Sequence, residues 1–319
     1  MIVVAGEALV DLVPSPAAAD GELAGLMPRL GGGPYNVAIA AGRLGSPVSF
    51  LSRVSTDLYG DALLERLHTA EVHTDLVQRG DEPTTLAVVG IGADGSARYS
   101  FYVEGTADRL VEDPGALPDN TSAVSFGTLS LVLEPGASAY EQVLRREAER
   151  GVLTVLDPNI RAALIQDPAA YRERYRSWLP HVGLLKVSVE DARWLADLPE
   201  DSSEDAVLEV VREWRKAGPA AIVLTRGGDG LAVLTGAGEV LRVPPRKVSV
   251  VDTIGAGDTV QGALLAWLHD HDSLTTGAVA NLTSEQWVEA LTYAGAAAAL
   301  TCSRAGAEPP YTAELAAFL

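Results

Sequence analysis

The sequence predicts an α/β protein in which a parallel β-sheet carries helices on both faces. From residue 122 onward, apolar β-rich runs alternate with segments of helical period, and this alternation favours a parallel sheet. A β-branched run at 248–251 predicts a buried strand, which a glycine turn at 255–257 joins to a helix. Two further β-rich runs, at 84–92 and 97–103, are joined by Ala93-Asp94-Gly95-Ser96, a hairpin signal. A hairpin breaks the βαβ rhythm, so it is expected to stand off the main sheet.

The N-terminal elements follow from apolar runs and their periods. Residues 2–5 are apolar and no basic segment precedes them, which predicts a buried first strand rather than a signal peptide. Residues 17–30 are small, polar and turn-rich. Helices are expected at about 35–44 and at 61–70, with a strand between them at 48–54.

The alternating part of the chain predicts four pairs of strand and helix and one further strand. The strands are expected at 123–126, 152–156, 183–187, 221–224 and 231–234, and the helices at 140–150, 171–179, 190–196 and 206–217. Ligands of open α/β sheets bind beyond the carboxyl ends of the strands. The segments 157–161, 188–191 and 225–230, which follow strands, and the turn at 255–258 therefore predict the rim of a binding site.

Composition limits the classes of partner. A chain of 319 residues that is 47% hydrophobic can bury a large core and is expected to form one α/β domain over 1–319 with an appendage. Its net charge of −19 argues against nucleic acid and anionic membranes, and local features must hold any polyanion. The single Cys302 excludes an internal disulfide, and no Cys/His spacing suggests zinc. No apolar stretch is long enough for a bilayer, so the expected location is the cytoplasm.

The turn at 255–257 has the composition of an anion-binding site. Amides at the start of a helix have no intrahelical partner, and small residues let them close around a phosphoryl group. Asp258 stands where these amides gather negative charge. It is either a helix cap or a general base that takes the proton of a substrate hydroxyl.

Three other motifs admit both a binding and a structural interpretation. Gly31-Gly32-Gly33-Pro34 with Asn36 lets a ligand approach the backbone and meet an amide, or forms a flexible loop with a cap. Arg161 holds an anion or forms a structural salt bridge. The glycines of 225–230 pass close to a ligand, or make a hairpin turn.

Several attractive signals fail. The sequence lacks a Gly-x-x-x-x-Gly-Lys-Ser/Thr P-loop, and Gly262 follows Gly255-Ala256-Gly257 at the wrong spacing for a dinucleotide fingerprint. The missing fingerprint speaks against a nucleotide-binding oxidoreductase. His269-Asp270-His271 predicts a solvated helix end rather than a metal site.

Two longer strings carry a family resemblance. Asp252 to Thr259 resembles the C-terminal signature of the PfkB (ribokinase-like) family of carbohydrate kinases, and 31–45 closely resembles its N-terminal signature. Within that family, the strings at 6–14, 104–109 and 157–161 are most similar to bacterial fructokinases. The resemblance implies a ribokinase-like, Rossmann-type sheet. It also implies a small β-lid from segments near 12–30 and 84–108.

The resemblance implies ATP-dependent phosphorylation of a sugar hydroxymethyl group, with fructose to fructose 6-phosphate as the leading reaction. A 2-keto-3-deoxygluconate kinase and a ribokinase or nucleoside kinase are alternatives, and a non-catalytic sensor is the alternative from another class. Asp258 would be the base, with Gly255, Ala256 and Gly257 as the anion hole. The implied sugar contacts are Asp11, Gly32, Gly33, Asn36, Tyr102, Arg161 and Asp258, and the implied nucleotide contacts are Ser188, Thr225, Gly227, Gly230, Gly255 and Gly257.

The resemblance also implies Mg²⁺ and K⁺, with departures from the family pattern. Where the family has Asn-x-x-Glu for water-mediated Mg²⁺, this chain has Ser188-Val189-Glu190-Asp191, which leaves Glu190 and Asp191 as candidates. Asp252, Ile254, Thr301 and Gly306 are the K⁺ candidates, although Pro310 stands where some relatives have Ser. Gly295 replaces an Asn that relatives often carry near adenine. The expected partners are a small-molecule sugar, ATP and a second copy of the chain across the lid.

Overall fold

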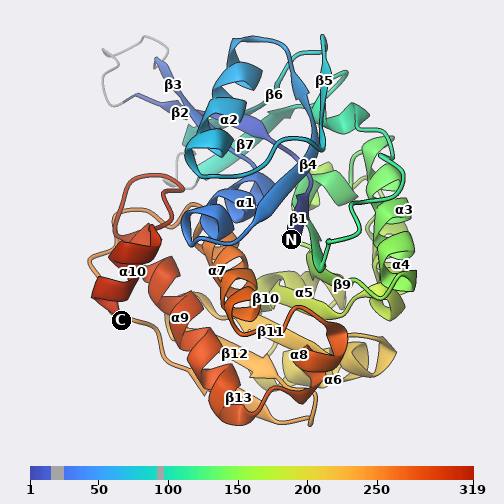
Figure 1. Ribbon diagram of the computed structural model, residues 1–319, viewed down its shortest axis with the longest axis vertical. Helices are drawn as coiled ribbons and strands as arrows, with labels where there is room; N and C mark the ends of the chain where they lie inside the picture. The colour runs from blue at the N-terminus through green and yellow to red at the C-terminus, as the bar shows by residue number, and fades with distance from the viewer. Residues whose placement is uncertain (16–24, 92–96) are drawn as a thin grey trace.

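Two β-sheets organise the chain, a large one that carries the helices and a small one that projects from it (Figure 1). The computed structural model describes residues 1–15, 25–91 and 97–319. Within them, nine strands form the large sheet in the order β13-β12-β11-β10-β9-β8-β1-β4-β5. Their bounds are β1 Ile2–Ala5, β4 Val48–Ser55, β5 Val77–Gly80, β8 Ala123–Gly127, β9 Leu153–Asp157, β10 Leu184–Ser188, β11 Ala221–Thr225, β12 Leu231–Leu234 and β13 Val240–Val243. The strands from β5 to β11 pair in parallel, and β12 and β13 close one edge antiparallel.

Helices cover both faces of this sheet, which confirms the predicted α/β class. One face carries α1 Gly33–Arg43, α2 Leu58–Thr69, α7 Ala256–Asp270, α8 Thr276–Asn281, α9 Ser284–Cys302 and α10 Thr312–Phe318. The other carries α3 Gly136–Glu149, α4 Pro168–Trp178, α5 Val189–Leu195 and α6 Glu204–Ala217.

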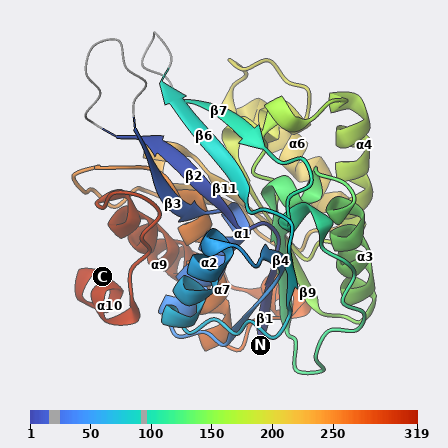
Figure 2. The ribbon, with the colours of Figure 1, turned by 90° about the horizontal axis from the view of Figure 1, so that it is seen from above.

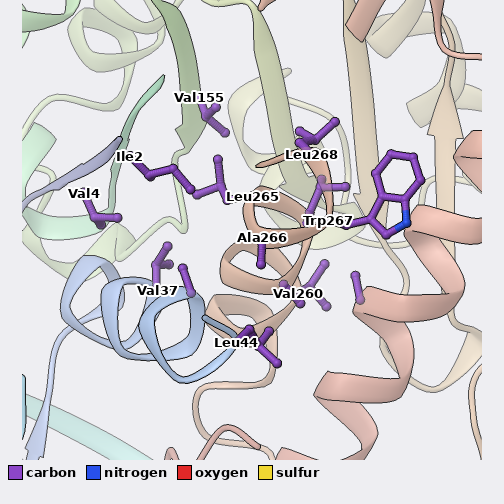
Figure 3. Close-up of a cluster of buried hydrophobic side chains, with 14 of the residues drawn as sticks. Ile2, Val4, Val37, Leu44, Val155, Val260, Leu265, Ala266, Trp267 and Leu268 are labelled. Atoms are coloured by element: carbon purple, nitrogen blue, oxygen red, sulfur yellow. The ribbon is translucent and has the colours of Figure 1, made fainter. Parts of the chain in front are cut away.

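Strand β1 shows how alternation builds the two cores. Ile2 and Val4 point into the cluster with α1 and α7 (Figure 3). Val3 and Ala5 belong to the cluster with α3 on the other face. Successive side chains of a strand face opposite sides. A run that is apolar at every position, such as 2–5, is therefore buried on both faces.

The small sheet has the order β3-β2-β6-β7, with bounds β2 Leu9–Pro14, β3 Leu26–Gly31, β6 Thr85–Ile91 and β7 Ala97–Tyr102 (Figure 2). The predicted hairpin strands β6 and β7 pair antiparallel, and their expected turn at 93–96 lies outside the described residues. Residues 26–30 were expected to be turn-rich, which is wrong. They belong to β3, which pairs antiparallel with β2, and the register runs from Leu9 opposite Gly31 to Pro14 opposite Leu26. Residues 17–24 of that expectation also lie outside the described part.

The strand predicted at 248–251 is wrong. Val250 and Val251 are 64% and 62% exposed, and the segment between β13 and α7 belongs to no strand. The amide of Val251 donates to the carbonyl of Cys302 at the end of α9, at 2.8 Å. β-Branched residues favour strands because they pack well on a half-buried pleated surface, and this segment does not lie on such a surface.

Several elements were not predicted, namely β5, β13, α8, α9 and α10. Helix α9 begins with a capping box formed by Thr283 and Gln286. No helix within residues 1–15, 25–91 and 97–319 has both the length and the apolar character needed to cross a bilayer.

Candidate active site

Helices α1 and α7 cross closely enough to bring two predicted site residues into contact. A Cβ on Gly262 would lie 2.6 Å from Cβ of Ala40, so only glycine permits this approach. One turn earlier on each helix, on the same faces, stand Asp258 and Asn36. Asn36 Nδ2 donates to Asp258 Oδ2 at 2.9 Å.

The Asp258 carboxyl is 8% exposed, and burial raises its pKa to about 6. The hydrogen bond from Asn36 and the charges of Lys186 and Arg161 oppose this rise in pKa. A carboxylate with this pKa is ionised at neutral pH and remains basic enough to take a proton. The cap interpretation accounts for neither the burial nor the contact with Asn36.

The turn before Asp258 requires glycine. Gly255 has φ +74°, and a Cβ there would lie 2.5 Å from Cβ of Ala307. The first-turn amides of α7 therefore open directly beside Asp258, at the positive end of the helix dipole. This geometry is suited to an anion such as a phosphoryl group.

A buried ammonium lies beneath this turn. Lys186 is 4% exposed and forms an ion pair with Asp157 Oδ2. A Cβ on Gly257 would lie 3.4 Å from Lys186 Nζ. The cation thus adds positive charge to the side of the turn that faces the sheet.

The residues predicted to hold the sugar come from both sheets. Asp11 lies on β2, where burial raises its pKa to about 6 and the charge of Arg161 opposes the rise. Arg161 Nη1 donates to Asn159 Oδ1 at 2.8 Å and to the carbonyl oxygens of Asn159 and Ile160. Arg161 therefore braces its own loop at the end of β9, while its charge acts on both Asp11 and Asp258.

Two buried oxygens near Asp258 have no hydrogen-bond partner among the described residues, and one of them, on Asp157, belongs to a residue that lines a small cavity. Asn36 Oδ1 and Asp157 Oδ1 are buried and have no hydrogen-bond partner within the described part of the chain. A cavity of about 10 Å³ adjoins Asp258 and Gly33, which is about one water in size. Polar hydroxyl groups fit such a site. Gly32, with φ +115°, is the N-cap residue of α1, whereas Tyr102 ends β7 with an exposed side chain.

The predicted nucleotide residues follow neighbouring strands. Ser188 ends β10 beside Thr225 of β11, and Ser188 Oγ accepts the amide of Asp191 at 2.9 Å. A Cβ on Gly230 would collide with the carbonyl of Val243, whereas one on Gly227 would meet no atom within 4 Å. The loop after β11 is therefore tight at one end and open at the other, as a backbone that passes close to a ligand requires.

The candidates for metal ions differ in their surroundings. Asp191 Oδ1 accepts the amide of Ile160 at 3.1 Å, and burial raises the pKa of Asp191 to about 6, whereas Glu190 is exposed. Among the described residues no cluster of three or more His, Cys, Asp or Glu side chains is arranged for a metal.

The K⁺ candidates bracket the anion turn. Asp252 Oδ1 accepts the amide of Ile254 at 3.0 Å, and Oδ2 accepts the amide of Gly306 at 2.8 Å. Thr301 is buried, and its hydroxyl bonds Thr259 and the carbonyl of Ala297. Since the Asp252 carboxylate already joins the two segments, backbone carbonyls are the ligands they would offer.

Comparison with known proteins identifies the family. The model of the pfkB family of carbohydrate kinases matches residues 1–314. The chain belongs to this family. The kinase is 37% identical to a fructokinase of Rhizobium leguminosarum bv. trifolii over 287 residues, which cover 89% of this chain and 85% of that protein. It is 32% identical to fructokinase-1 of Oryza sativa subsp. japonica over 325 residues, 99% of this chain and 95% of that protein.

Solved structures agree with this assignment. The kinase is similar to a fructokinase from Xylella fastidiosa with bound ATP, with a TM-score of 0.87, 26% identity and coverage of 99% and 97% of the two chains. A fructokinase from Vibrio cholerae O395, solved with fructose, ADP and calcium, has a TM-score of 0.83 at 24% identity, covering 100% of this chain and 98% of that one. At that identity the second similarity shows the fold alone.

Sequence reasoning missed three buried charged residues of this kinase. Lys186 interrupts the apolar run of β10, and Asp157 was quoted only as part of the motif that contains Arg161. Glu7 was quoted only within the N-terminal string. A charge inside an apolar run was the available signal, because burying a charge is costly unless it is paired.

Proposed function

We propose that this chain transfers the γ-phosphoryl group of ATP to a hydroxymethyl group of D-fructose, forming fructose 6-phosphate and ADP. The observation that carries the proposal is the buried carboxylate of Asp258, bound by Asn36 at the glycine turn that opens α7. The fructokinases that match nearly the whole chain support the choice of sugar.

Each group has a defined task in this proposal. Asp258 takes the proton of the sugar hydroxyl, and the sugar oxygen forms a bond to the γ-phosphorus of ATP. The bond between the γ-phosphorus and the oxygen that bridges it to the β-phosphate breaks, which releases ADP. The amides around Ala256 and Gly257 stabilise the charge that develops on the phosphoryl oxygens. The positive charge of Lys186 adds to the stabilisation of these oxygens from the side of the turn that faces the sheet.

The remaining assignments follow the geometry around these groups. Asp11, Gly32, Gly33, Asn36 and Arg161 hold the sugar, with Tyr102 at the rim, and the loop 225–230 with Ser188 holds ATP. Asp191 would hold Mg²⁺, which would neutralise the charge of the phosphates when bound. The segments at 252–254 and 301–306 would hold K⁺.

A single domain over 1–319 carries a lid within 12–30 and 84–108, of which residues 12–15, 25–30, 84–91 and 97–108 are described. The lid is the candidate contact of a homodimer. The cytoplasm is the expected location.

The distribution of cations favours a neutral sugar over an acid sugar. An acid sugar needs a free guanidinium for its carboxylate. Arg161 donates to its own loop through Nη1, and Arg109 pairs with Glu104 at 2.7 Å, so of these two guanidinium groups a carboxylate would find only the remaining nitrogens of Arg161. Hydroxyl groups need only the acceptors of Asp11, Asn36 and Asp157.

The test is a panel of sugars with ATP and Mg²⁺, scored by ADP release. D-Fructose should exceed 2-keto-3-deoxygluconate in kcat/KM by at least about tenfold, or about 1.4 kcal/mol in transition-state binding. A preference for the acid sugar, ribose or a nucleoside in direct competition would refute fructose as the substrate but not the assignment of kinase activity. Sugar and ATP binding without ADP release would instead indicate a sensor.

A further inference from the structure

Glu7 is a buried carboxylate that joins two distant backbone segments. It follows β1 and is 2% exposed. Its Oε1 accepts the amide of Gly33 at 3.1 Å, and its Oε2 accepts the amide of Ser130 at 3.1 Å. Both oxygens are therefore engaged, each by a segment far away in the sequence.

Each of these amides lies at the start of a helical segment that has no cap of its own. Gly33 begins α1 after Gly32, and Ser130 lies in the 3₁₀ turn Thr128–Leu131 after Gly127. Neither glycine supplies a side-chain cap, so the first amides need an acceptor from elsewhere. The Glu7 carboxylate supplies an acceptor to each of the two amides, at the positive ends of both segments.

The first segment leads to the catalytic base. Helix α1 starts at Gly33 and carries Asn36 on its first turn, and Asn36 donates to Asp258. A displacement of the start of α1 would shift Asn36 and with it the Asp258 carboxylate.

The second segment leads to Arg161. Thr128 has φ +59°, a strained value for a β-branched residue. Its hydroxyl accepts a hydrogen bond from Asn159 Nδ2 at 3.2 Å, and Asn159 Oδ1 accepts from Arg161. A Cβ on Gly33 would collide with the hydroxyl of Thr128, so the two segments also touch each other.

We propose that Glu7 is a positioning residue that fixes the sugar pocket and the base relative to each other. It acts through Gly33 and Ser130, touches no reacting atom, and lies on the sugar side, away from the loop at 225–230. This inference rests on the proposed sugar kinase activity. A carboxylate is needed because both partners are N–H donors, and a glutamine accepts only one and turns its own NH₂ toward the other.

The test compares Glu7→Gln with a matched control, Glu147→Gln. Glu147 is an equally buried carboxyl, paired with Arg146 and Arg150 on α3. It lies at the amino end of β9, where its carbonyl accepts the amide of Val152 at 3.0 Å, whereas the site lies at the carboxyl end of that strand. The two variants lose the same chemical group at opposite ends of the sheet.

Glu7→Gln should lower kcat/KM for fructose by about 10- to 100-fold, the range of one lost charge-assisted hydrogen bond, with KM for ATP within about twofold of wild type. Glu147→Gln should leave both constants within about twofold, whatever its melting temperature. If Glu7→Gln does not fold, Glu7→Asp, which is too short to bridge both amides, replaces it. A kcat/KM for fructose within threefold of wild type, or an equal rise in KM for ATP, would overturn the proposal.

Amide exchange keeps this test separate from the proposed function. In Glu7→Gln the amide of Gly33 or of Ser130 should exchange at least about tenfold faster than in the wild type, whatever the substrate. If the wild type phosphorylates no sugar, the proposed function fails, and exchange alone decides whether Glu7 holds the two segments. Unchanged exchange at both amides would overturn the proposal in either case.

Discussion

Replacing Asp258 by asparagine separates its chemical role from its structural one. The amide has the same shape and still accepts the hydrogen bond from Asn36 Nδ2, but it cannot take a proton. The variant should therefore lose about two to four decades in kcat, the usual range for a general base, and keep its KM for fructose within a few-fold.

The same substitution should stabilise the protein. Burial raises the pKa of Asp258 from 3.8 to about 6, and a difference of about 2 pKa units corresponds to about 3 kcal/mol. The folded protein keeps this proton between pH 4 and 6 while the unfolded chain releases it, so the free energy of unfolding falls as the pH rises through this window. Asparagine removes that loss. At pH 8 the variant should melt about 4 °C above the wild type, from an unfolding entropy of about 0.7 kcal/mol/K for 319 residues, and at pH 4 the two should melt together.

Two measurements check this prediction. The pH profile of kcat/KM for the wild type should fall about tenfold per pH unit below pH 6, because only the ionised carboxylate accepts the proton. Thermal unfolding of both proteins at pH 4 and pH 8 gives the stability difference. Turnover of the variant near the wild-type rate would show that another group is the base, and equal melting temperatures at pH 8 would refute the burial argument.

Three further changes probe the neighbours of the base. Fructose should slow amide exchange in 85–91 and 97–102 if the small sheet closes over the sugar. Unchanged exchange at saturating sugar would refute the role of this sheet as a lid. K⁺ should stimulate turnover relative to a bulky organic cation, because Asp252 accepts the amides of Ile254 and Gly306 and so fixes two segments that would offer carbonyl ligands to the ion, and equal rates in both buffers would count against that site. Lys186→Met combined with Asp157→Asn, which leaves no unpaired buried charge, should fold and lose about 10²- to 10³-fold in kcat. A rate near that of the wild type would mean that the ammonium only stabilises the fold.

The large sheet was predictable because its information is local. A mainly apolar run such as 152–156 or 221–224 is buried on both faces wherever it lies in the sheet, and the period of 206–217 defines a helix by itself. The run at 248–251 has the same composition and forms no strand. A segment forms a strand only where a partner strand is available. Strands β12 and β13 already close one edge of the large sheet, and no local pattern contains this information. The pairing of β2 with β6, across more than seventy residues, is non-local in the same way.

The candidate site was predictable where strand ends carry polar motifs, since parallel strands bring their carboxyl ends to one edge. Lys186 was missed because it stands inside the apolar strand β10, and Glu7 because it lies between the apolar strands β1 and β2, where the pattern indicates only burial. Their burial was itself informative. A buried ammonium requires a carboxylate, and a buried carboxylate requires donors, so each implies partners that the chain must bring from elsewhere. Asp157 meets the first need from the neighbouring strand, and two backbone amides meet the second. A charged residue inside an apolar strand thus predicts that a partner exists, and only the fold determines which one.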